Sequence, residues 1–189
     1  MTLRRGFRAE AERIAAGLRD DLGIHRADPL PLDDAAEARS VRLVSAADLI
    51  DPDRLAELER IQAFSFSACT FHIDGHSVIV YNPIRSEPRR KSDVAHELSH
   101  LLLEHELTEI REVAGVPFRT CRADQEEEAT NLAGTLLLPR PLLLRAVAQG
   151  LGPEGVATAY GVTLEMARFR INTTGVATQM QRARARRAR

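Results

Sequence analysis

The stretch KSDVAHELSHLLLEH, residues 91–105, decides both the fold and the chemistry that we expect of this chain. It contains His96, Glu97 and His100 in the spacing H-E-x-x-H. Residues four apart lie one above the other on a helix, so the two imidazoles can bind one zinc ion. Glu97 then points beside the metal and can activate a bound water. The alternative interpretation is an amphipathic helix that matches the motif by chance.

The residues around the motif predict where its helix begins. Ser92 can cap the start, and Asp93 then falls in the first turn, where acidic side chains are favoured. Residues 85–91 are basic and contain Pro88, so we expect them to form a loop before the helix. His105 follows His100 by five residues, which points it away from the ligand face and predicts a structural role.

Composition describes a soluble globular protein of 189 residues, with 44% hydrophobic and 28% charged side chains. No apolar run has membrane-spanning length, and the charged first 18 residues do not resemble a signal peptide. Cys69 and Cys121 lie far apart in the chain and are expected to be two reduced thiols. We therefore expect a cytoplasmic protein that does not bind membranes.

A β-hairpin is the clearest element before the motif. Alternating residues 64–73 and the β-branched run 77–81 flank Asp74-Gly75, a strong hairpin turn. His72 and His76 lie on this hairpin and are expected to be structural rather than ligands. We expect residues 107–122 to be irregular. The other predicted elements are helices over 7–22, 32–38, 46–60, 124–138 and 141–149, a short strand over 41–44, and two short helices within 155–175.

A third metal ligand is expected among Glu126, Glu127 and Glu128, which open the helix over 124–138. A catalytic zinc usually has three protein ligands, although an acidic triplet is more often a solvated helix start. An apolar seam follows the triplet: Ala129, Leu132, Ala133, Leu136 and Leu137. On a helical wheel Glu126 lies at the edge of this seam, Glu128 lies farther away, and Glu127 faces solvent.

These signatures together resemble those of the ImmA/IrrE family of zinc metallo-endopeptidases. Glu126-x-x-Ala129, followed by Leu132-Ala133 and by LLLP at 136–139, is similar to the second family signature. The hairpin end VYNP at 80–83 and the HELSH motif are also similar, so the resemblance covers roughly residues 7–175. Thr130 stands where the family usually has Asn, with Asn131 one place later, and Leu132 replaces Phe.

The resemblance implies an α+β fold, with a small gluzincin-like core in which a β-hairpin or small sheet lies beside the HExxH helix. It implies that His96, His100 and Glu126 bind Zn²⁺ and that Glu97 is the general base. Family members are typically cytoplasmic regulators that cleave a DNA-binding repressor, so we expect a helix-turn-helix protein as substrate. We expect the substrate to pair with the edge of the strand over 77–81. Tyr81 is one candidate for stabilising the oxyanion.

The C-terminal region allows an alternative function. We expect a peptidase domain over residues 1–150, a helix-turn-helix-like pair over 151–178 packed on it, and a disordered tail over 179–189. Ala157, Gly161 and Val162 have helix-turn-helix spacing, and Arg168 and Arg170 follow. The tail contributes five arginines, so that residues 1–181 alone carry a net charge of −6 within a total of −1. Nucleic-acid binding, by a DNA-binding or toxin–antitoxin-type regulatory module, is therefore the alternative to proteolysis.

Overall fold

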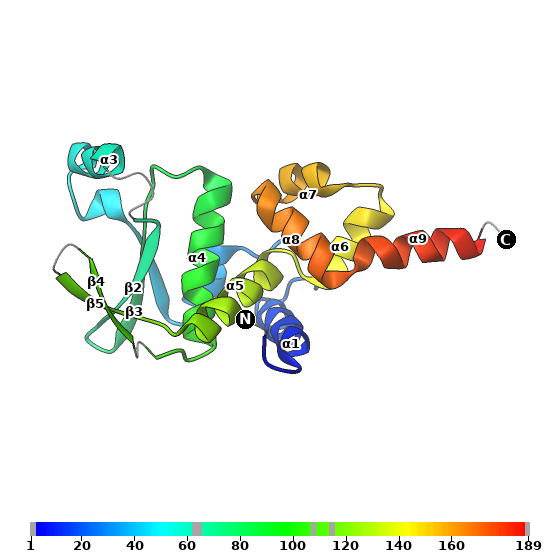
Figure 1. The fold of residues 1–189 in the computed structure, drawn as a ribbon, viewed down its shortest axis with the longest axis horizontal. Coiled ribbons are helices and arrows are strands. Elements are labelled where there is room, and N and C mark those ends of the chain that lie inside the picture. Colours follow the sequence, from blue (N-terminus) through cyan, green and yellow to red (C-terminus); the bar gives the residue numbers. More distant parts are fainter. Residues whose placement is uncertain (1–2, 62–65, 107–108, 114–115, 188–189) are drawn as a thin grey trace.

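The protein has an α+β fold, as the sequence predicts. The computed structural model describes residues 3–61, 66–106, 109–113 and 116–187. Figure 1 shows the strands and helix α3 (Pro52–Ile61) at one end of the molecule, and helices α6 (Arg140–Ala148), α7 (Pro153–Tyr160) and α8 (Leu164–Thr174) toward the other. Helices α4 (Glu87–Leu102) and α5 (Ala123–Leu137) lie between them.

The larger sheet has three strands in the order β1-β3-β2: β1 (Val41–Ser45), β3 (His76–Tyr81) and β2 (Ala68–Ile73). Strands β2 and β3 form the predicted hairpin, and Asp74 and Gly75 have positive φ angles of 50° and 78°, as a two-residue hairpin turn requires. Strand β3 also pairs in parallel with β1. Because β3 is central, the expectation that a substrate pairs with its edge is wrong. Among the described strands, β2 is the edge strand on the other side of β3 from β1, and it packs against α4.

The two faces of this sheet are buried against different helices. Ile79 belongs to the main core, and α4 packs against β2 and β3. Val78 and Val80 face the other way and pack with Ala46 and Leu55. These last two come from a 3₁₀ turn over Ala46–Asp48 and from α3, so the single helix expected over 46–60 is divided. Pro52 begins α3, because proline is favoured at the first position of a helix.

Helix α4 carries the H-E-x-x-H motif and begins earlier than predicted. Its N-cap is Ser86, Pro88 lies in the first turn, and the Ser92 hydroxyl donates within the helix to the Pro88 carbonyl at 3.1 Å. The expected loop over 85–91 is therefore wrong, since a first-turn proline lacks only an N–H that has no helical partner. The helix ends at Leu102, and Glu104 follows with a left-handed φ of 53°.

Helix α5 is largely buried and packs against α4 and α1 (Phe7–Asp21). Its predicted apolar seam is confirmed as buried: Ala129, Leu132, Ala133, Leu136 and Leu137. Two buried arginines hold its C-terminal end. Arg19 donates to the Leu136 carbonyl at 2.8 Å, and Arg170 donates to the Leu138 carbonyl at 3.1 Å. These bonds satisfy carbonyls that have no partner within the helix.

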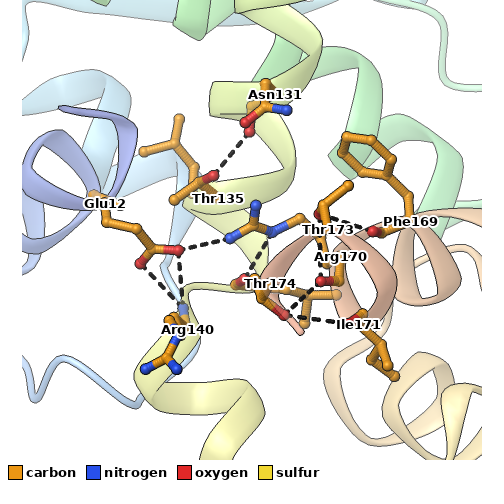
Figure 2. A network of polar contacts seen from close by, with 12 residues as sticks. Glu12, Asn131, Thr135, Arg140, Phe169, Arg170, Ile171, Thr173 and Thr174 are labelled. Carbon is orange, nitrogen blue, oxygen red and sulfur yellow. Dashed lines mark hydrogen bonds and ion pairs between the residues drawn. The ribbon is translucent and has the colours of Figure 1, made fainter. Parts of the chain in front are cut away.

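Arg170 also joins α8 to α1 (Figure 2). Its guanidinium donates to Glu12 Oε1 at 2.8 Å, and Glu12 accepts the backbone N–H of Arg140 at 3.1 Å. Helix α8 crosses α5 at Gly134, where an added Cβ would stand 2.8 Å from Arg170 Cδ. Helices α7 and α8 are the predicted C-terminal pair, and α8 is packed on the core.

Helix α2 (Leu32–Glu37) matches its prediction. The irregular structure expected over 107–122 is wrong, because β4 (Glu109–Val113) and β5 (Val116–Thr120) form an antiparallel hairpin; residues 107, 108, 114 and 115 lie outside the described structure. Pro117 made a strand look unfavourable in the sequence. Both strands of a two-stranded hairpin are edge strands, however, and proline is tolerated in edge strands.

The C-terminal segment is helical as far as the structure describes it. Helix α9 (Val176–Arg187) extends away from the other helices in Figure 1, where the sequence predicted a disordered tail from residue 179. Arg, Gln, Met and Ala are strong helix formers, which accounts for the difference. The division of the chain at residue 150 stays a prediction. Among the described helices, none combines the length and apolar character needed to cross a lipid bilayer.

We predict that Arg170→Met lowers the free energy of unfolding by about 3 kcal/mol, because it leaves Glu12 and the Leu138 carbonyl without their buried partner. The matched control is Arg168→Met in the same helix. Arg168 is exposed and pairs with exposed Glu154, so its loss should leave stability nearly unchanged. Denaturant unfolding compares the two variants, and equal effects would contradict the anchoring role of Arg170.

Candidate metal centre

Helices α4 and α5 bring three ligand-type side chains together. His96 Nε2 lies 3.1 Å from Glu126 Oε2 and 3.1 Å from His100 Nε2, and His100 Nε2 lies 3.6 Å from Glu126 Oε2. All three residues are half-buried. The histidines are one helical turn apart on α4, and Glu126 comes from the first turn of α5. The group could hold one metal ion.

The dimensions of this triangle fit a tetrahedral ion. Ligands about 2.1 Å from a tetrahedral metal lie about 3.4 Å from one another. The three distances, 3.1, 3.1 and 3.6 Å, lie on both sides of that value. Two imidazoles and one carboxylate are also a common donor set of catalytic zinc, which keeps a further position for water or substrate.

The charge state of Glu126 suits a ligand. Hydrogen bonds from His100 and His96 hold the pKa of the Glu126 carboxyl well below its usual range, against the opposing effect of burial. The carboxyl is therefore ionised at neutral pH, the form that binds a metal. Glu128, two residues along the helix, lies near His105 and not within this triangle. Glu127 has intermediate exposure, although the helical wheel placed it facing solvent.

Glu97 is held by a neighbouring strand. The Thr70 hydroxyl on β2 donates to Glu97 Oε2 at 2.7 Å. A cavity of about 260 Å³ opens over this pair and the three ligand-type residues. The other side chains that line it are Cys69, His72, Leu101, His105 and Cys121. A larger cavity of about 720 Å³ lies between α2 and the Asp74-Gly75 end of the sheet, but it contains none of the motif residues, so we place the site in the smaller one.

The two cysteines are thiols, as predicted, and both line the site. Burial, together with the Glu97 carboxylate, raises the pKa of Cys69 to about 11. Burial and the carboxylates of Glu126 and Glu97 raise the pKa of Cys121 to about 11 as well. In the metal-free protein a thiol with such a pKa stays protonated at neutral pH, and a protonated thiol is a poor nucleophile.

The other histidines lie outside the ligand group, as expected, and Tyr81 lies away from the site. His105 was expected to point off the ligand face, and its Nδ1 lies 3.0 Å from His100 Nδ1, on the side of the ring opposite the ligand nitrogen. His72 lines the cavity and contacts Ser77 Oγ at 3.1 Å, whereas His76 is exposed at the turn. The Tyr81 ring packs against the Arg90 guanidinium, 5.0 Å from its centre, and does not line the cavity.

A comparison with known families identifies the chain. A profile of the peptidase M78 family, described as the IrrE N-terminal-like domain, matches residues 55–172. That range includes the hairpin β2–β3 and helices α4 and α5. The chain belongs to this family. The predicted ImmA/IrrE relationship is thus confirmed. Membership of this family indicates a peptidase, whose substrate is a protein. No curated protein and no solved structure matches the chain significantly.

The sequence of this M78 family member did not indicate the roles of Thr70, His105 and Glu128. Thr70 could have been suspected only from its place on a strand expected to lie beside the motif helix. The other two depend on how the chain turns after Leu102, for which the sequence carries no glycine signal.

We predict that Glu126→Ala loses bound metal, because two imidazoles alone hold zinc weakly. Glu127→Ala is the matched control from the same helical turn and should retain one equivalent. His96→Ala and His100→Ala should behave like Glu126→Ala. Elemental analysis of the purified variants measures this, and a Glu126→Ala protein with full metal content would contradict the ligand assignment.

Proposed function

We propose that this protein is a zinc-dependent endopeptidase that cleaves one specific protein, a helix-turn-helix repressor, and so relieves repression. The observation that carries the proposal is the position of Glu97. Its carboxylate is anchored by Thr70 and lines the same cavity as the triangle of His96, His100 and Glu126. A base held beside a three-ligand metal site is the arrangement that peptide hydrolysis requires.

The metal, Glu97 and Thr70 each have a separate role in the proposed reaction. Bound zinc supplies a more acidic coordinated water and polarises the carbonyl of the scissile peptide. Glu97 accepts the proton of the attacking water and delivers it to the leaving amine. Thr70 binds only one carboxylate oxygen, Oε2, and thereby fixes the direction of the other. A ligand carboxylate on a helix separate from the motif supports the gluzincin-like arrangement.

The position of β2 at the edge of the described sheet supports an extended protein segment as substrate. A peptide can add to an exposed strand edge through main-chain hydrogen bonds. Side chains two apart on a strand share a face, and Thr70 and His72 both line the cavity. The choice of a repressor and of a cytoplasmic setting rests on analogy with the family.

The DNA-binding alternative is less well supported. Arg170, one of the two arginines on the second helix of the pair, is buried against Leu138 and Glu12, and Arg168 pairs with Glu154 at 3.0 Å. The remaining argument for nucleic acid is the sequence of α9, which has four arginines and no acidic residue. We therefore do not propose this function.

We predict that Glu97→Gln keeps zinc but lowers the rate of repressor cleavage by about 10²–10⁴-fold, because an amide cannot accept the proton of the water. Cleavage of a repressor encoded beside this protein, followed on a gel, and zinc content measured on the same preparation check both halves. Glu127→Gln is the control. Near-normal cleavage by Glu97→Gln would contradict the role of Glu97 as the general base.

We predict that Thr70→Val lowers kcat/KM about tenfold, the effect of losing about 1.4 kcal/mol of a hydrogen bond to a charged group. Valine keeps the shape of threonine but cannot donate to Glu97. Thr70→Ser keeps the hydroxyl and should retain most activity. If serine and valine are equally impaired, the hydroxyl is not what positions the base.

A further inference from the structure

We infer that His105 and Glu128 are positioning residues, which together hold the imidazole of His100 in the orientation and tautomer that binds metal. This inference rests on the proposed metal site. His100 has its Nε2 in the ligand triangle, while its Nδ1 faces the opposite way. There it lies 3.0 Å from His105 Nδ1 and 3.3 Å from Cys121 Sγ.

The direction of these hydrogen bonds follows from the metal site. If Nε2 of His100 binds a metal through its lone pair, the ring proton is on Nδ1 and has to be donated. His105 Nδ1 can accept it only when the proton of His105 is on Nε2. That nitrogen lies 3.5 Å from Glu128 Oε2, so the negative charge of the carboxylate favours a proton on Nε2, which is the tautomer of His105 that accepts from His100.

Glu128, the outermost residue of the series His100, His105 and Glu128, is itself held in place by an arginine. Arg4 donates through Nε to Glu128 Oε1 at 2.7 Å and also pairs with Glu10 of α1 at 2.7 Å. Only 6% of the His105 side chain and 16% of the Glu128 side chain are exposed. The partners of His100 are thus largely shielded from water, which would otherwise compete for these hydrogen bonds.

The backbone explains why His105 reaches His100. Beyond α4, the N–H of His105 donates to the His100 carbonyl at 3.0 Å and the N–H of Glu104 donates to the Leu101 carbonyl at 3.2 Å. With Glu104 left-handed, these bonds form a Schellman motif, which brings the side chains of His105 and His100 together. The contact is therefore a consequence of the way the helix ends.

Zinc affinity tests this inference without measuring catalysis. We expect His105→Leu to weaken zinc binding by the full-length protein about 10-fold to 100-fold, measured by competition with a chromophoric chelator. His105→Gln should recover most of the affinity, because its amide can accept from His100 and donate to Glu128 at the same time. His76→Leu, at the exposed hairpin turn, is the control and should bind zinc normally.

Several outcomes would overturn the inference. These are a His105→Leu affinity within twofold of the wild type, a His105→Gln protein as weak as His105→Leu, or an equal loss in Cys121→Ala, which would make the thiol the partner of His100.

Melting of the metal-free proteins separates folding defects from ligand positioning. If His105→Leu does not fold, Glu128→Leu should still weaken zinc binding several-fold more than Glu127→Leu, and equality would refute the inference. A wild-type protein that binds no zinc would overturn the proposed function as well, whereas the other failures leave it standing.

Discussion

The packing of α5 against α4 is the constraint on which the site depends. The histidines are on one helix and Glu126 is on the other, so any slip between the helices separates the three candidate ligands. The far end of α5 is held by Arg19 and Arg170, which donate to its last carbonyls. Glu126 is thus placed by contacts made about three helical turns away, and the apolar seam between transmits that position.

The same kind of buried arginine ties helix α8 to the rest of the fold. A guanidinium offers five donors in a fixed plane, so Arg170 can bind a helix-terminal carbonyl and a carboxylate at once. Gly134 leaves the space that its stem occupies. Because α8 contributes this residue to the core, the helix cannot also present it to DNA.

Local signals made much of the fold predictable from sequence. The Asp74-Gly75 turn and the periodic seam of α5 each depend on residues a few positions apart, and both were located correctly. Proline led to two wrong predictions, because it is common in loops but also occurs in the first turn of a helix and in edge strands. Pro88 suggested a loop but lies in the first turn of α4, and Pro117 concealed a strand. The order β1-β3-β2 could not be predicted, because the parallel pairing joins distant segments.

Within the site, sequence indicated the groups that could touch a metal but not those that hold them. His96 and His100 follow from helical spacing, and Glu126 from its place beside a buried seam. The contact of His105 with His100 was not predicted, because a five-residue separation turns a side chain to another face only while the helix continues. Helix α4 ends at Leu102, and Glu104 takes a left-handed conformation that an L-residue adopts at some cost. That reversal brings His105 back onto His100, so the surroundings of this candidate ligand are determined by where the helix stops.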